Sequence, residues 1–256
     1  DAALLALSRI DQLSTELQQE GNYLKALEAM ERGLVLRKHF FGGDAVEVWQ
    51  ACATIAEMCN LLAMTYLQQE DFGMVLELLK KAHVLTERHP PGRAVTYNNF
   101  ACYYRRQGKL HSALQYLEKA VKLEERIDGV ENPADTHLNL CAVLSQLGRH
   151  GDALDHAQQS LILLQEELFG DDAVDVAAPE QSHRVVVMAI AYHNVAVEQE
   201  FLKKWRQSVQ SYTKGLELAE RFLGSSHGVA TTLRRSLAAA RRAVAAAKAK
   251  STAAAT

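Results

Sequence analysis

Three asparagines return at the same place in a repeated phrase of this chain. Asn99, Asn139 and Asn194 each stand two residues before a small side chain. An amide carries both a donor and an acceptor, so it can pair with the N–H and the C=O of a peptide backbone. A row of amides is therefore suited to holding an extended chain whatever its side chains are. The alternative is that the amides bond neighbouring helices to one another, and the two roles can coexist.

The sequence contains no recognisable catalytic or metal-binding constellation. The ten histidines are scattered, and neither His-Glu-x-x-His nor a paired Cys/His set occurs, so a zinc site is not expected. The phosphate-loop patterns GxxxxGK[ST] and GxGxxG are also missing. The acidic run at Asp171, Asp172 and Asp175 lacks the twelve-residue calcium-loop pattern. We therefore expect a protein that is not an enzyme and that needs no cofactor.

Composition points to a folded protein without a nucleic-acid partner. The 256 residues are 48% hydrophobic and 23% charged, and the net charge of −3 gives no basic excess. The four cysteines form no CxxC pair and lie in helical apolar patterns, which favours buried thiols in a reducing compartment. No run of 18 apolar residues predicts a membrane span, and no signal peptide is visible. These features predict a cytoplasmic protein.

The elements that carry the asparagines are predicted to be helix pairs. Apolar residues recur at spacings of three and four between breaks marked by glycine and proline, and no segment alternates at period two, so the fold is predicted to be all-α. The first helix of each pair carries large-x-x-large-small, and a short turn follows, often with glycine. The second helix carries a small residue that lets the two helices approach closely. Five such pairs are identified by that residue, with a larger side chain in the second: Ala26, Val75, Ala113, Ala153 and Ser208.

This pattern resembles the tetratricopeptide repeat. Residues 97–120 match it best, whereas the fifth pair has Lys203 where the turn glycine is expected. The spacing exceeds the ~34 residues of the basic unit, and the excess follows the second helices, where Phe/Leu-Gly precedes a polar pair. In this the chain is similar to the longer repeats of kinesin light chains. The resemblance implies a right-handed solenoid over residues 1–227, a capping helix over 228–250 and a frayed tail at 251–256.

The resemblance also implies that the first helices line a concave groove. Asparagines in that groove hold peptide backbone in proteins of the kinesin light chain type. Arg105, Arg106 and Asn98 are then candidates to tune selectivity, although solvated surface arginines are an equal alternative, and His193 is either a ligand contact or a helix-surface residue. The candidate peptide-binding residues are Asn60, Asn98, Asn99, Arg105, Arg106, Asn139, His193 and Asn194.

The function predicted from these features is that of an adaptor or scaffold that binds an extended segment of a partner protein. Transport along microtubules, a motor complex or a ciliary role follows by analogy alone. The alternative is a constitutive subunit of a larger cytoskeletal or ciliary assembly, docked through the convex face or the C-terminal helix. Residues 228–256 contain six basic residues and no acidic one. The insertion at 171–187 is either a linker or a partner-specific loop.

Overall fold

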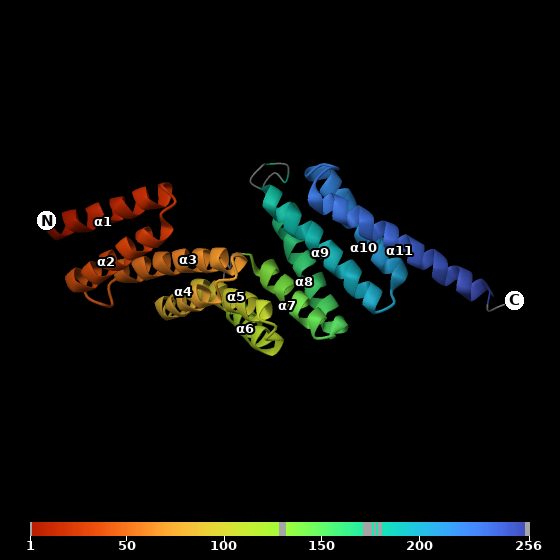
Figure 1. Ribbon diagram of the computed structural model, residues 1–256, viewed down its shortest axis with the longest axis horizontal. Helices are drawn as coiled ribbons and strands as arrows, with labels where there is room; N and C mark the ends of the chain where they lie inside the picture. Colours follow the sequence, from red (N-terminus) through yellow and green to blue (C-terminus); the bar gives the residue numbers. More distant parts are fainter. Residues whose placement is uncertain (1, 128–131, 171–175, 177, 179–180, 254–256) are drawn as a thin grey trace. The chain divides into compact units, whose positions relative to one another are not determined.

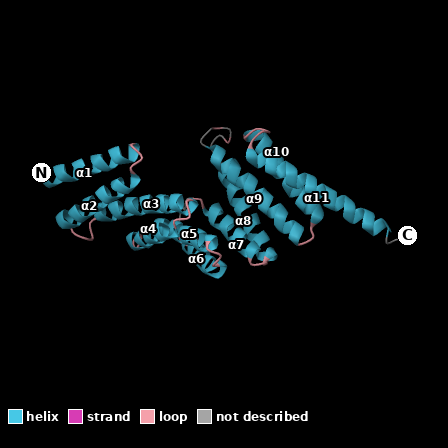
Figure 2. Cartoon of the chain, in the orientation of Figure 1, coloured by secondary structure: helices cyan, strands magenta, loops and turns pink. Residues whose placement is uncertain are grey.

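The computed structural model describes residues 2–127, 132–170, 176, 178 and 181–253. This part of the chain contains eleven α-helices and no strand (Figures 1 and 2), which confirms the all-α prediction. Residues 171–175, 177, 179 and 180 of the predicted insertion and residues 254–256 of the predicted tail lie outside the described residues. The helices are α1 (Ala2–Gln19), α2 (Tyr23–Phe41), α3 (Val46–Gln68), α4 (Phe72–Leu85), α5 (Pro90–Arg106), α6 (Leu110–Glu124), α7 (Pro133–Gln146), α8 (His150–Phe169), α9 (Ser182–Phe201), α10 (Trp205–Phe222) and α11 (Gly228–Ala253).

The helices form two compact units. The first unit spans residues 1–131 and holds α1 to α6, and the second spans 132–256 and holds α7 to α11. Within each unit successive helices pack as hairpins, α1 with α2, α3 with α4 and α5 with α6, then α7 with α8 and α9 with α10. The helix α11 packs on both α9 and α10. None of the helices in the described part combines the length and apolarity needed to cross a membrane.

Each hairpin turns at one residue in the left-handed backbone region. Three of these turn residues are glycines, Gly21, Gly108 and Gly148, which adopt a positive φ without steric cost. The other two, Glu70 and Lys203, have φ values of 62° and 59°. In all five turns the next N–H reaches back to the carbonyl oxygen five residues earlier, as a Schellman motif requires. The turn geometry is therefore shared even where glycine is missing.

The small-residue pattern is the basis of the packing between the two helices of each hairpin. All five second-helix residues that identify the pairs are fully buried, including Val75, which is the largest of them, and Ser208. Seven residues before each turn residue the first helix also buries a small side chain. These residues are Ser14, Ala63, Ala101, Cys141 and Ala196.

The helix α11 packs like the first helix of a further hairpin. It buries Ala230, Leu233 and Leu237 against the preceding hairpin, whereas Arg235 and Arg242 are exposed. The side of α11 that packs on the preceding hairpin is therefore apolar, and its other side is charged.

Candidate peptide-binding site

In the first unit, Asn60 forms a buried bridge between α3 and α5. The residue is 6% exposed, and its Nδ2 donates to Thr96 Oγ1 at 3.0 Å. Asn60 Oδ1 accepts a hydrogen bond from Asn99 Nδ2, also at 3.0 Å. Thr96 is fully buried and donates in turn to the carbonyl oxygen of Gly92 at 2.8 Å. Asn60 therefore bonds neighbouring helices, which is the alternative role considered for the amides.

Asn99 differs from Asn60 because it reaches the surface. It is half-buried, and among the described residues its side chain has no hydrogen bond beyond the one to Asn60. Its Oδ1 is thus an acceptor whose direction is set by the bond at Nδ2. Val95 lies four residues before Asn99 on the same helix face and is 46% exposed, and Leu61, next to Asn60, is 59% exposed. An oriented amide between two exposed apolar side chains is a surface that can contact a polypeptide.

Two arginines follow on the same helix. Arg105 is half-buried, Arg106 is exposed, and neither has an ion-pair partner in the part of the chain that the structure describes. Asn98 is half-buried and is engaged in an interaction of its own. Burial raises the pKa of the Cys102 thiol, so the thiol is neutral beside Asn99. We call the surface formed by Leu61, Val95, Asn99, Cys102, Arg105 and Arg106 the amide face.

The second unit carries the remaining candidate residues on α7 and α9. Asn139, His193 and Asn194 are all half-buried, and Asn139 already has an interaction partner. The Nε2 atom of His193 lies 3.3 Å from Ser236 Oγ on α11, and the ring packs edge-on against Tyr212. Burial lowers the pKa of His193, while a hydrogen bond with Asn194 acts in the opposite direction. His193 thus lies between helices rather than at an open surface.

Asn60 and His193 make equivalent contacts from the same repeat position. Each residue lies ten positions before the turn residue of its hairpin, and each bonds a hydroxyl on the next first helix. Between α7 and α9 the corresponding positions hold Leu138 and Ala191, both apolar. Neither position is polar there, as expected if buried polar groups must be paired.

An ion-pair cluster engages Asp135 near the start of α7. Arg184 at the start of α9 is 8% exposed, and its Nη1 donates to Asp135 Oδ1 at 2.9 Å. Its Nε and Nη2 donate to the two carboxylate oxygens of Glu167, each at 2.6 Å. The sequence analysis missed Arg184 because its partners lie on two other helices. Asp135 is consequently a structural residue as well as a surface one.

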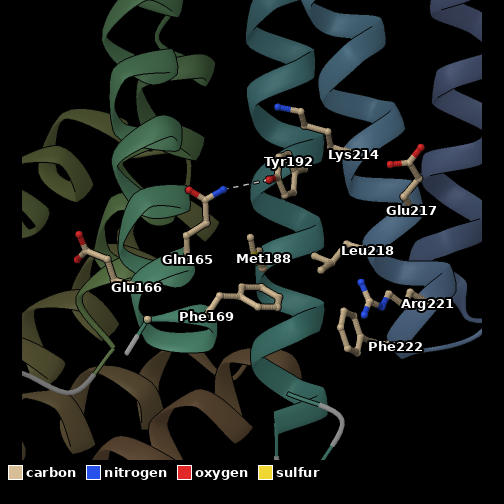
Figure 3. A pocket seen from close by; sticks show the side chains of 11 residues that line it. Gln165, Glu166, Phe169, Met188, Tyr192, Lys214, Glu217, Leu218, Arg221 and Phe222 are labelled. Atoms are coloured by element: carbon tan, nitrogen blue, oxygen red, sulfur yellow. Dashed lines mark hydrogen bonds between the residues drawn. The ribbon is translucent and has the colours of Figure 1, made fainter. Parts of the chain in front are cut away.

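The sequence analysis also missed a cavity on the opposite side of α9. It is formed by α8, α9 and α10, and its lining includes Phe169, Tyr192 and Arg221 (Figure 3). Within the described residues, no three His, Cys, Asp or Glu side chains gather to hold a metal ion.

The comparison with protein families agrees with the geometry. Residues 52–126, which include most of α3 and all of α4, α5 and α6, match the model of the tetratricopeptide repeat. This segment of the chain is built from tetratricopeptide repeats. The tetratricopeptide fold supports protein–protein interaction in general, and proteins built from it are generally non-enzymatic scaffolds.

Two curated relatives are similar to about half of the chain. A "Clustered mitochondria protein homolog" from Coccidioides immitis is 31% identical over 129 residues, and one from Ajellomyces capsulatus is 30% identical over the same length. Each match covers 48% of this chain and 10% of the relative, so the chain spans only about a tenth of these relatives.

The fold is shared with a putative kinesin light chain from Podosopora anserina that has nearly identical TPR-like repeats. The TM-score is 0.51 at 14% identity, over 84% of this chain and 95% of the other. A signal-transduction ATPase with a tetratricopeptide repeat sensor from Pyrococcus horikoshii gives a TM-score of 0.57 at 15% identity, over 90% of this chain and 31% of the other. At these identities the likeness concerns the fold alone.

Proposed function

We propose that this protein is a non-enzymatic adaptor that binds an extended peptide segment of a partner on the amide face. The observation that carries the proposal is the geometry of Asn99. Its Nδ2 is held by Asn60, and its Oδ1 makes no hydrogen bond within the described residues. Leu61 and Val95 supply exposed apolar surface on the same two helices. An acceptor oriented in advance loses little freedom when it pairs with a backbone N–H, which favours binding.

Residues around Asn99 supply selectivity in this proposal. Arg105 and Arg106 pair with acidic side chains of the ligand, because a guanidinium can bind a carboxylate with two hydrogen bonds. Asn98 contributes at the edge of the amide face. In the second unit, Asn139 and Asn194 are candidates for the same kind of contact with peptide backbone, and His193 supports Asn194 through their hydrogen bond. A cytoplasmic location and a role in cargo transport or complex assembly, by analogy with kinesin light chains, belong to the same proposal.

The test is a selection of unstructured peptides displayed on phage against the complete chain. Replacement of Asn99 by Ala should weaken the binding of the selected peptides by about 1–3 kcal/mol, since a buried peptide N–H would be left unpaired. Asn22→Ala is the matched control, because it removes an exposed amide from the turn between α1 and α2 and should leave the affinity unchanged. Unchanged affinity in the Asn99→Ala variant would refute the proposal.

A second candidate function is docking into a larger assembly through α11. Arg235, Arg241 and Arg242 are exposed and unpaired in the described part of the chain, which favours an acidic partner surface. Binding through these arginines should weaken steeply with salt, whereas binding through an amide should respond less. Titration of partner affinity against NaCl therefore separates the two candidates.

A further inference from the structure

The second unit contains a cavity of about 670 Å³ that the amide asparagines do not border. It opens where α8 and α10 flank α9, and Met188 and Tyr192 of α9 line it between those two helices (Figure 3). Tyr192 and Asn194 are two residues apart, so they lie on nearly opposite sides of α9. The cavity is therefore separate from the proposed peptide site, and its volume lies within the ~300–1,000 Å³ typical of ligand pockets.

The α8 wall of the cavity carries one large apolar side chain. Phe169 is 50% exposed, and the other α8 lining residues are Gln165 and Glu166, with Gly170 just after the helix. Figure 3 shows the Phe169 ring directed into the cavity between α8 and α9. Gln165 donates from Nε2 to the Tyr192 hydroxyl at 3.2 Å.

The α10 wall has a basic edge. Lys214 and Arg221 are seven residues apart and exposed. In Figure 3 the Lys214 ammonium extends toward α9, and the Arg221 guanidinium lies over the Phe222 ring at 5.0 Å from its centroid. The two acidic lining residues, Glu166 and Glu217, point away from the cavity in the same view. The charge that faces the opening is thus positive, and it is confined to one wall.

The basic pair has the spacing of two helical turns. Lys214 and Arg221 are seven residues apart, which corresponds to a rise of roughly 10.5 Å along α10. A partner helix aligned with α8 and α10 presents residues i and i+7 at this same spacing. Docking of an amphipathic helix into an apolar groove is a recurring mode of recognition. An extended segment alternates its side chains between two faces and matches this spacing less well.

We propose that this cavity binds an amphipathic α-helix of a partner protein. The partner helix places apolar side chains against Phe169, Met188 and Leu218. Two of its acidic residues, seven positions apart, face Lys214 and Arg221. The apolar contacts supply affinity, and the acidic pair sets the register and the direction of the partner helix.

The experiment uses the complete chain and a phage library of single 18-residue helices that are randomised on one face. Selection should enrich helices with an apolar seam bordered by acidic residues at i and i+7. The double variant K214E/R221E should bind the enriched helices about tenfold more weakly or worse, since two attractive pairs become repulsive. F169S should weaken them similarly. Helices in which the acidic pair is changed to lysine should recover binding to K214E/R221E.

R235E/R242E is the matched control, because it reverses two exposed charges at the same spacing on α11. Neither this control nor Asn99→Ala should change the affinity of the enriched helices. Enrichment without an acidic pair, or equal binding to the wild type and K214E/R221E, would overturn the proposal. So would sedimentation that shows a dimer of the chain alone which F169S dissociates, because a second copy would then occupy the cavity.

Discussion

Asn60 Nδ2 donates to Thr96 Oγ1 at 3.0 Å and so joins α3 to α5 at a site where both residues are buried. Neither helix can slip by one residue without leaving a buried polar group unpaired, which would cost about 1–3 kcal/mol. The contact therefore fixes the register of two successive first helices. It also orients Asn99, because Asn60 Oδ1 holds the Asn99 amide from behind.

Replacement of Thr96 by Val should lower the free energy of unfolding of the first unit by about 1–3 kcal/mol. Valine keeps the shape but leaves the Asn60 amide with an unpaired donor. Trp49 and Trp205 are the only tryptophans and lie in different units, so urea unfolding of a Trp205→Phe background follows the first unit. Thr65→Val is the control, since Thr65 is exposed and bonds only the carbonyl oxygen of Leu61. An equal loss in both variants would contradict the prediction.

The hairpins were predictable from the sequence because close helix packing demands small residues at fixed spacings. Ala113 and Ala153 illustrate this, and Val75 shows that the spacing matters more than the size of the side chain. The pairing of Asn60 with Thr96 was harder to predict, because the partners are 36 residues apart. A position-by-position comparison of the repeats would have revealed this pairing. Leu138 and Ala191 occupy the positions that correspond to Asn60 and Thr96, and both are apolar.

The cavity beside α9 could not be predicted from local patterns. In the sequence, Lys214 and Arg221 look like an ordinary solvated helix face, and Phe169 looks like part of the core. Whether these side chains line a cavity depends on which faces of α8 and α10 border the same opening, and only the folded unit determines that. The same reason applies to Arg184, whose two partners come from α7 and α8.

Glycine at the two non-glycine turn positions should stabilise the chain. Glu70 and Lys203 have φ values of 62° and 59°, a conformation that costs a residue with a Cβ about 1–2 kcal/mol. Part of this gain is lost because glycine is more flexible in the unfolded chain. We therefore expect Glu70→Gly to stabilise the first unit, and Lys203→Gly the second, by up to about 1 kcal/mol in urea unfolding. Gly108→Ala, at the same turn position, should destabilise by a similar amount, and a loss of stability in Glu70→Gly would contradict the interpretation.

Arg184 should be the most costly ion-pair residue to remove. It is buried, and it holds Asp135 and Glu167 together through three hydrogen bonds. Both carboxylates are partly exposed, so Arg184→Ala should cost about 2–3 kcal/mol, below the usual range for fully buried pairs. Arg184→Lys should restore less than half of this, because an ammonium cannot reproduce the two parallel bonds to Glu167. The measurement is urea unfolding followed through Trp205 in a Trp49→Phe background, and full recovery with lysine would contradict the role assigned to the guanidinium.

The second unit should lose stability in acid because of a histidine pair. His137 Nδ1 and His156 Nδ1 lie 2.9 Å apart between α7 and α8. Burial, together with the charge that His156 would carry, lowers the pKa of His137 to about 4 from 6.5, and burial also lowers the pKa of His156. The unfolded chain therefore binds protons that the folded chain does not. The stability is complete above pH 6.5 and falls as the pH decreases from 6.5 toward 4.

Replacement of His137 by Tyr should flatten this pH dependence. Tyr97 and Tyr192 occupy the equivalent position, eleven residues before the turn residue, in two other hairpins. The loss avoided at pH 4 should be roughly 1–2 kcal/mol, a value reduced for solvent screening of the half-exposed ring. Trp205 fluorescence in urea between pH 8 and 4 gives the measurement. His183→Gln, which removes an exposed histidine from the same unit, should leave the profile unchanged. If His137→Tyr keeps the wild-type slope between pH 6.5 and 4, the acid sensitivity originates elsewhere in the unit.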